Sequence, residues 1–399
     1  MALRRAWAGA AAVAALALCI VIWRLWIGDP LTDAMEDRLY DLRMSLRAPL
    51  PAPASVALVA IDEPSLAAIG TGAPLRLAVA EAVDILREEG ALAVGIDLLL
   101  VERTSADAAL AAALARMPGA ILAIASLRDV AVTHPSARME QALARSAFRT
   151  VLQRRRQQGV MLPMALPQEE LATAALMGHV NLLRAPDRVM RRMPLALAIG
   201  NGLTMPALPL TAARLALGLP QQALRYEAGA RIMLGDRIIE TDRRGSVAIV
   251  HRGAAGDVDR VSLRALLRGD LPRGGVAGRV VLIGATAESL GDIGATPLGA
   301  DVPGVETLAA VTAQLVEGRV IRRGRVGAIA TIALALTGAL LAWLAALRPT
   351  APLALVATAA VWAGALFTIA QAFIVGSLMI DATAVLGATH FRPSISPSP

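Results

Sequence analysis

The sequence VALVAID, residues 56–62, sets the fold class of this protein. Its six apolar residues, three of them β-branched, precede an acidic residue, which is typical of a strand buried on both faces that ends at a sheet edge. We expect an amphipathic helix at 75–89, a second buried strand at 91–97, a helix at 106–116 and a third strand at 120–126. Strands that alternate with helices in this way form a parallel sheet with right-handed crossovers. The sequence therefore predicts an α/β fold.

Shorter elements follow along the chain. Further strands are expected near 179–183, 194–199, 231–234, 237–240 and 247–250. An apolar strand at 279–286 runs into a loop, and a helix at 305–316 closes the region. We expect a mixed α/β domain with a largely parallel sheet and a β-rich inserted portion.

The composition predicts that this domain is combined with membrane segments. Apolar residues make up 56% of the 399 residues and charged residues 18%, and the mean hydropathy is +0.58. These values are too apolar for an ordinary soluble enzyme and too polar for a transporter that lies wholly in the bilayer.

The first apolar stretch, residues 6–27, follows Arg4 and Arg5 and precedes a run of acidic residues. This charge asymmetry predicts a transmembrane anchor with the N-terminus in the cytoplasm. A cleaved signal peptide is the alternative interpretation. Apolar stretches at 326–347, 352–374 and 376–391 predict two to three C-terminal transmembrane helices. Asp381 in the last stretch is expected to pair with another helix or to lie at an interface.

The expected organisation has four parts. They are a cytoplasmic tip and anchor at 1–28, a periplasmic domain at 29–323, transmembrane helices at 326–391 and a disordered tail at 392–399.

Several kinds of chemistry are excluded by composition. Lysine is absent and all 39 Lys and Arg positions are arginine. The chain therefore has no Walker-A lysine, no kinase lysine and no lysine that could form a Schiff base. The single Cys19 excludes intrachain disulfides, and the four histidines (His134, His179, His251 and His390) are not spaced as a metal pair. We expect neither a metal site nor a cofactor. The net charge is +7, but with only 3% aromatic residues the chain lacks the stacking side chains of nucleic-acid modules.

Candidate ligand-binding residues lie where the predicted strands end. Asp62 and Glu63 follow the first strand, Asp97 ends the second, and Arg76 is nearby in sequence. Ligands of parallel sheets bind at the carboxyl ends of the strands. These groups either bind a polar ligand or cap helices and pair with Arg76 as a structural network. A hydrolytic pair is a third possibility, but no nucleophile–base motif accompanies it, so no catalytic residues are assigned.

A second candidate is the loop GATAESLGDIGATPLG, residues 284–299. It contains Thr286, Asp292 and Thr296, and its backbone amides are suited to hold an anion at a strand-to-loop junction. The alternative is a tight turn that packs against the sheet. His179 and His251 are interpreted as single core or surface histidines.

Several strings of the sequence, in this order, resemble the type-two CHASE domain, the cyclase- and histidine-kinase-associated extracellular sensor of bacterial signalling proteins. They are DRLYDLRMSLRAP (37–49), VALVAIDEPSLAAIG (56–70), REEGALAVGIDLLLVE (87–102), GHVNLLRAPDRVMRRMPL (178–195), LPLTAARLALG (208–218) and VVLIGATAESLGDIGATPLGADVPGVETLAAVTAQLVEGRVI (280–321). The last string is the most specific. One departure is GTGAPLR (70–76), which keeps Arg76 but lacks the family's tryptophan.

The resemblance implies a membrane-anchored periplasmic sensor in the bacterial inner membrane that is not itself an enzyme. Family members control a nucleotide cyclase or a kinase that follows their C-terminal helices, and we expect this effector to be absent from the present chain. The expected partners are a small-molecule or envelope signal, the lipid bilayer, a second copy of the chain and a separate effector protein. The alternative is a periplasmic enzyme or envelope assembly factor that uses Asp62, Glu63 and Asp97.

Overall fold

The protein has two compact units, Met1–Ala48 with Ile321–Pro399, and Pro49–Val320. They are called the terminal unit and the central unit below. The computed structural model describes residues 14–15, 17–23, 30–47, 49–126, 135–149, 164–200, 203–227, 231–242, 244–253, 258–290, 293–322, 325–346 and 351–389. The central unit begins at Pro49, whereas the sequence placed the start of the periplasmic domain at residue 29.

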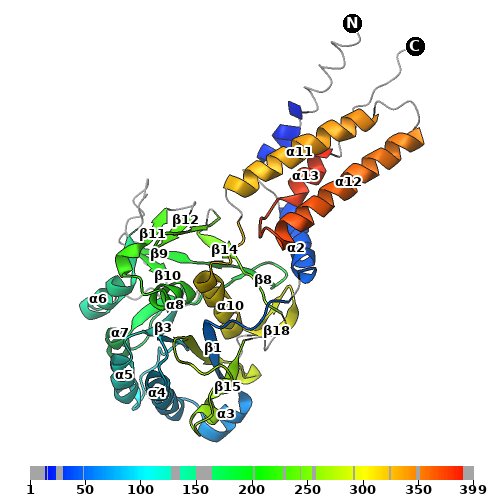
Figure 1. Cartoon of the computed structure of the whole chain (residues 1–399). Coiled ribbons are helices and arrows are strands. Elements are labelled where there is room, and N and C mark those ends of the chain that lie inside the picture. Colours follow the sequence, from blue (N-terminus) through cyan, green and yellow to red (C-terminus); the bar gives the residue numbers. More distant parts are fainter. Residues whose placement is uncertain are drawn as a thin grey trace, which may run out of the picture. The chain divides into compact units, whose positions relative to one another are not determined.

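A parallel sheet forms the centre of the central unit (Figure 1). Its strands, in spatial order, are β15 (Arg260–Ser262), β1 (Val56–Ile61), β16 (Val280–Ala285), β2 (Ala93–Asp97), β3 (Ala120–Ser126) and β6 (Leu176–His179). The short β5 (Met164–Ala165) is antiparallel to the end of β3. The prediction of a mixed α/β domain with a largely parallel sheet is confirmed. Strand β16, late in the chain, lies between β1 and β2.

The alternation of side chains along β1 shows why its sequence is continuously apolar. Ala57, Val59 and Ile61 belong to the hydrophobic core on one face of the sheet, and Val56 and Leu58 belong to the core on the other face. Successive side chains of a strand point to opposite faces, so a strand covered on both sides needs apolar residues at every position.

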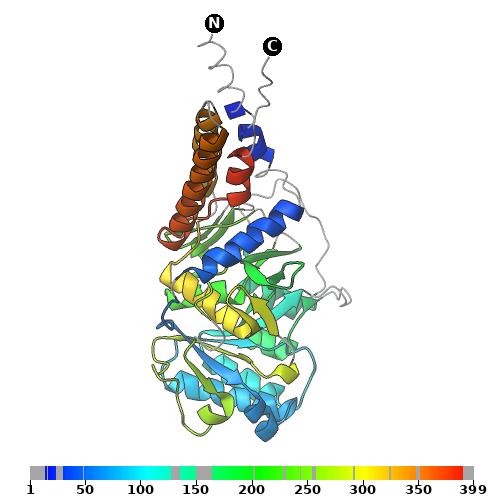
Figure 2. The same ribbon diagram turned by 90° about the vertical axis from the view of Figure 1, so that its right-hand side faces the viewer.

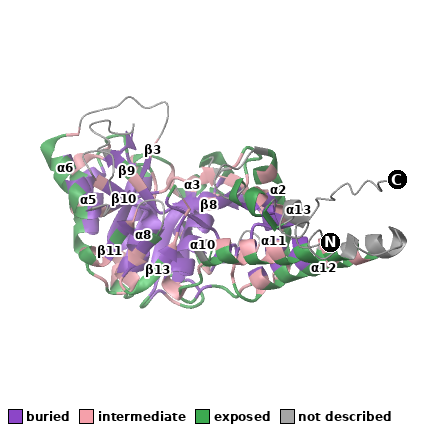
Figure 3. Cartoon of the chain, turned by 90° about the horizontal axis from the view of Figure 1, so that it is seen from above, coloured by how far each residue is buried: buried purple, intermediate pink, exposed green. Residues whose placement is uncertain are grey.

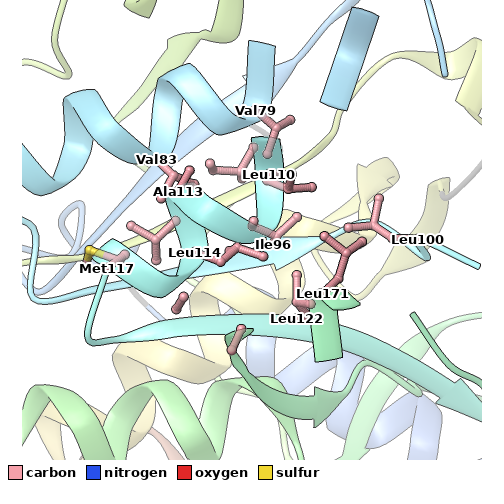
Figure 4. Packing of buried hydrophobic residues seen from close by; sticks show 14 of the residues in the cluster. Val79, Val83, Ile96, Leu100, Leu110, Ala113, Leu114, Met117, Leu122 and Leu171 are labelled. Atoms are coloured by element: carbon pink, nitrogen blue, oxygen red, sulfur yellow. The ribbon is translucent and has the colours of Figure 1, made fainter. Parts of the chain in front are cut away.

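The first of these cores is covered by helices. They are α3 (Glu63–Ile69), α4 (Ala73–Glu88), α5 (Asp107–Arg116), α6 (Ala137–Ser146), α7 (Glu169–Ala174) and α9 (Leu263–Leu266). Figure 4 shows Val79 and Val83 of α4 and Leu110 and Leu114 of α5 packed over Ile96 of the sheet. The helix expected at 75–89 corresponds to α4, and the helix expected at 106–116 corresponds to α5.

The opposite face of the sheet is covered by α8 (Leu208–Ala216) and α10 (Gly304–Glu317). Every residue of α10 from Gly304 to Leu315 is buried, and the helix is coloured accordingly in Figure 3. The β-rich portion contributes to the same core as α10, through Ile232, Leu234 and Ile239. Helix α10 is therefore an internal element of the central unit.

The β-rich portion consists of small antiparallel sheets. These are β4 (Phe148–Arg149), β10 (Leu203–Pro206) and β9 (Ala196–Gly200); β11 (Leu224–Glu227), β12 (Arg231–Leu234) and β13 (Arg237–Glu240); β14 (Ser246–Ala248), β8 (Met190–Pro194) and β7 (Leu183–Arg184); and the hairpin of β17 (Ile293–Thr296) and β18 (Gly299–Pro303).

The terminal unit is helical. It contains α2 (Pro30–Ser45), α11 (Arg325–Ala346), α12 (Ala351–Ile374) and α13 (Ala382–Thr389), which Figure 1 labels and Figure 2 shows from the side. Helix α11 contacts both α12 and α13. Asp381 caps α13, because its Oδ1 accepts a hydrogen bond from the Ala384 amide at 2.9 Å. The buried carboxylate of Glu36 accepts one from the Ala382 amide at 2.9 Å and pairs with Arg43. Both carboxylates thus accept hydrogen bonds from amides at the start of α13, where negative charge is favoured by the helix dipole.

Within the ranges that the structure describes, no single helix is long and apolar enough to cross a membrane, so the expected number of transmembrane helices is not supported. Helices α3 and α4 meet the same criterion only together, as a pair bent by 112°, and by length and composition alone.

Candidate functional site

The carboxyl ends of the central strands bring three of the predicted residues to one edge of the sheet. Asp62 directly follows β1, Asp97 is the last residue of β2, and Thr286 directly follows β16. The registers pair Ile61 with Ala285 and Gly284 with Asp97, so the three positions belong to neighbouring strands.

Asp62 serves as the N-terminal cap of α3. Its Oδ1 accepts hydrogen bonds from the Ser65 amide at 3.0 Å and the Ser65 hydroxyl at 2.6 Å. The same oxygen accepts one from the Ser262 hydroxyl, on β15, at 2.9 Å. Glu63 Oε1 accepts one from the Ser289 amide at 3.1 Å. These carboxylates therefore stabilise loops at the sheet edge, as an N-cap residue does.

Arg76 does not pair with Asp62. Its guanidinium forms a buried ion pair with Asp107 at the start of α5 and donates a hydrogen bond to the carbonyl of Glu102 at 2.5 Å. Burial raises the pKa of Asp107, but hydrogen bonds from Thr104 and Arg76 outweigh this effect and hold the pKa below its ordinary value. Asp107 was not recognised in the sequence, where it resembles any acidic residue in a first helical turn.

Asp97 lies beside the start of α10. A Cβ at Gly284 would lie 3.1 Å from the Asp97 Cβ and 2.6 Å from Cγ2 of Val305. Helix α10 thus begins in close contact with the ends of β2 and β16, and only glycine fits between them. The Thr286 amide donates to the carbonyl of Ile61 at 3.0 Å, which continues the pairing of β1 and β16 beyond the strand.

Thr296 forms the turn of the β17–β18 hairpin. Its Oγ1 accepts hydrogen bonds from the amides of Gly299 at 3.1 Å and Leu298 at 3.3 Å. Asp292 lies outside the described residues. The described contacts give the hydroxyl of Thr296 a role in its own hairpin, and anion binding by this loop stays a prediction.

The two described histidines differ in their surroundings. His179 is fully buried, neither ring nitrogen has a hydrogen-bond partner among the described residues, and burial lowers its pKa to about 3. His251 is buried with its Nε2 2.8 Å from the carbonyl oxygen of Met190. His134 and His390 lie outside the described residues.

A cavity of about 660 Å³ lies at the opposite, amino-terminal edge of the sheet, where β1, β15 and β16 begin. We call it the arginine pocket; it is lined by Ala52, Pro53, Ala54, Val258, Asp259, Arg260, Arg273, Gly274 and Arg279. The sequence interpretation missed it because the general rule for parallel sheets directs attention to the carboxyl ends. One signal was present: arginines alternate with glycines in RGDLPRGGVAGR (268–279), just before β16.

The two ends of the central unit are joined by Arg252, in what we call the Arg252 clasp. The carbonyl oxygen of Arg252 accepts a hydrogen bond from the amide of Leu50 at 3.1 Å. Its guanidinium donates to the carbonyl of Pro51 at 2.8 Å and to Oε2 of Glu317 at 2.6 Å. Arg252 is buried and Glu317 ends α10, so one side chain links the first residues of the unit to its last helix.

Comparison with known proteins gives a family. A model of the CHASE2 domain matches residues 13–347, which is most of the chain. No curated protein and no solved structure matches it. The matched range includes the whole parallel sheet, the Arg252 clasp and helix α10. The chain therefore belongs to the CHASE2 domain family, the extracellular sensor domains of signalling receptors.

Proposed function

We propose that this chain is the membrane-anchored periplasmic sensor module of a bacterial transmembrane receptor of the cyclase or kinase type. The central unit would bind the signal, and the terminal unit would hold the module in the inner membrane with the N-terminus in the cytoplasm. The module would act as a homodimer, and its output would pass to an effector in a separate protein.

The Arg252 clasp is the observation that carries this proposal. The chain passes between the two units after Ala48 and after Val320. The clasp joins the segment that follows the first passage to the end of α10, which precedes the second. A signal that displaces either segment would therefore reach both connections at once. The buried α10, which runs along the sheet, would transmit changes at the carboxyl edge to the same point.

Exposed apolar side chains support membrane anchoring of the terminal unit. On α12, Val356 and Phe367 are exposed by 66% and 65%, and Val375, directly after this helix, is exposed by 80%. On α11, Ile329 is 65% exposed. Apolar surface of this kind is typical of contact with lipid or with another protein, and the proposal assigns it to the bilayer.

The contacts at the carboxyl edge favour a sensor over an enzyme. Asp62 is a helix cap and Arg76 pairs with Asp107, so both side chains are held by structural contacts. A ligand-binding role for Asp62, Glu63, Arg76, Asp97, Thr286, Asp292 and Thr296 stays a prediction.

Topology and ligand response together test the proposal. A reporter enzyme that is active only outside the cytoplasm, fused after Pro135, is expected to be active, and a cytoplasmic reporter at the same position is expected to be silent. The full chain in lipid nanodiscs is then screened against small molecules by thermal unfolding. We expect a ligand to raise the Tm and to protect the amides of Leu50 and of residues 315–319 from hydrogen exchange. A cytoplasmic signal at Pro135 would overturn the proposal.

A further inference from the structure

We propose that the arginine pocket is the ligand site of the central unit and that it takes a small organic anion bearing a carboxylate or a phosphate group. This inference rests on the proposed sensor function and names the class of signal. The volume of about 660 Å³ falls within the range of roughly 300–1,000 Å³ that is usual for small-molecule sites.

The charges in the pocket select an anion. Three arginines line it, against one carboxylate, Asp259. Arg279 pairs with Asp259 at 2.8 Å, and Arg260 pairs with Glu306 at 2.9 Å while remaining half-exposed. The guanidinium of Arg273 has no carboxylate partner among the described residues and is exposed. Guanidinium groups bind carboxylates and phosphates through paired hydrogen bonds, so the surplus cation at Arg273 suits either group.

The wall that carries Arg273 is held in place before any ligand binds. Asp259 accepts hydrogen bonds from the amides of Arg273 at 3.1 Å and Gly274 at 3.0 Å. Burial raises the pKa of Asp259, but these bonds and the one from Arg279 outweigh it and hold the pKa below its ordinary value. The carboxylate therefore stays ionised and fixes the loop. A preformed site binds more tightly because less ordering is needed on binding.

A close approach at Gly274 shows that the loop lies directly on the ion pair. A Cβ at this position would lie 2.7 Å from Nη1 of Arg279 and 3.3 Å from Oδ2 of Asp259. A side chain here would therefore displace Arg279 or separate the pair. The remaining walls, Ala52, Pro53, Ala54 and Val258, are small and apolar, which leaves room for a short carbon skeleton beside the charged group.

The pocket is connected to the Arg252 clasp through the segment that begins the unit. Ala52, Pro53 and Ala54 line the pocket, and the carbonyl of the preceding Pro51 accepts the hydrogen bond from Arg252. Arg279 donates to the carbonyl of Pro53 at 3.3 Å. An anion bound to the pocket arginines would therefore act on residues 51–54, the segment that the Arg252 clasp links to the end of α10.

The test uses the full chain in nanodiscs of neutral phosphatidylcholine, so that lipid head groups supply no competing net charge. Binding of succinate, citrate and glycerol 3-phosphate is measured by calorimetry, with succinamide as the uncharged counterpart. We expect at least one anion to bind with saturation, more weakly at higher salt, and succinamide not to bind. Succinate or citrate binding indicates a carboxylate signal, and binding of glycerol 3-phosphate alone indicates a phosphate ester.

Two matched variants localise the site. Arg273→Gln is expected to weaken binding by about tenfold or more, because it removes one charge-assisted contact. Its fold should be retained, since the side chain has no carboxylate partner to lose. Arg268→Gln, an exposed arginine of the same loop that does not line the pocket, should bind as the parent does.

Two results would overturn the pocket assignment. Either no anion binds, or Arg273→Gln loses no more affinity than Arg268→Gln. Neither result touches the sensor proposal, which is judged by the Pro135 reporters and the ligand screen.

Discussion

At the residue scale, two arginine–aspartate pairs of the central unit differ mainly in burial. The side chains of Arg76 and Asp107 are 8% and 5% exposed, and those of Arg116 and Asp84 are 51% and 30% exposed. Arg76→Ala leaves a buried carboxylate without its cation, so we expect it to lower the free energy of unfolding by about 3–5 kcal/mol. Arg116→Ala should cost far less, because water screens the exposed pair. Urea unfolding of both variants measures the difference, and equal losses would contradict the structural role of the buried pair.

A second residue-scale prediction concerns His179. The pKa of His179 is about 3 in the folded protein, whereas its ordinary value, taken for the unfolded chain, is 6.5. Between these two pH values the unfolded chain binds a proton that the folded chain does not. Stability from this group is complete above pH 6.5 and is lost as the pH falls toward 3. At pH 5 the loss relative to pH 7.5 should be about 2 kcal/mol. His179→Met should remove this part of the pH dependence, which urea unfolding at the two pH values measures. A variant with the parental slope would show that another group is responsible.

The contacts of single residues were predictable only where they are local. Ser65 is only three residues after Asp62, in the helix that Asp62 caps, and a capping role was among the interpretations of the sequence. The partner of Arg76 is 31 residues away, and only the packing of α4 against α5 brings the two together. Pairing across helices leaves no periodic signal in the sequence.

At the element scale, two glycines control how closely helices approach the sheet. A Cβ at Gly178 of β6 would lie 2.5 Å from Cα of Leu208, which is backbone at the start of α8. A Cβ at Gly284 would meet the side chain of Val305 at 2.6 Å. Both alanine variants should be destabilised by about 1–3 kcal/mol through overpacking, and Gly178→Ala should be the worse, since backbone cannot rotate away. Thermal unfolding of both variants tests this order, and a larger loss for Gly284→Ala would show that α8 moves aside easily.

The existence of the main elements was predictable, because buried strands and amphipathic helices carry strong patterns. The strand expected at 120–126 coincides with β3, and the helix expected at 305–316 lies within α10. Helix α3 was not predicted, since seven residues with a proline at the second position give little periodicity. The place of β16 between β1 and β2 was not predicted either, because register between distant strands depends on tertiary packing.

At the scale of the whole molecule, the Arg252 clasp predicts that the two ends of the central unit move together. Arg252→Met keeps the apolar stem of the side chain but removes its donors to Pro51 and Glu317. We expect faster amide hydrogen exchange at Leu50 and Ala52 and at 314–319, with unchanged protection in β1 and β16. Arg268→Met, on an exposed arginine, is the control. Unchanged exchange at both ends would show that the clasp does not couple them.

The division into units was predictable in part. The apolar excess at both ends of the chain indicated that the termini differ from the middle, and the two termini do form one unit. Helix α2 falls within the range 29–323 that was assigned to the domain from the sequence, and no hydrophobic pattern reveals its buried Glu36–Arg43 pair. Its place depends on contacts with α12 and α13, more than 300 residues away.

The position of β16 has a consequence for biogenesis. Strands β1 and β2 emerge within the first 97 residues, yet the strand that pairs with both begins only at Val280. Until Val280, β2 lacks a neighbour on one side, and β1 lacks neighbours on both sides until β15 begins at Arg260. Unpaired strand edges of this kind are prone to wrong pairing and aggregation. Closing so long a loop also slows folding, because chain entropy is lost before the contacts form. We therefore expect fragments that stop before residue 280 to be poor starting points for expression, because they leave β1 and β2 without the strand that joins them.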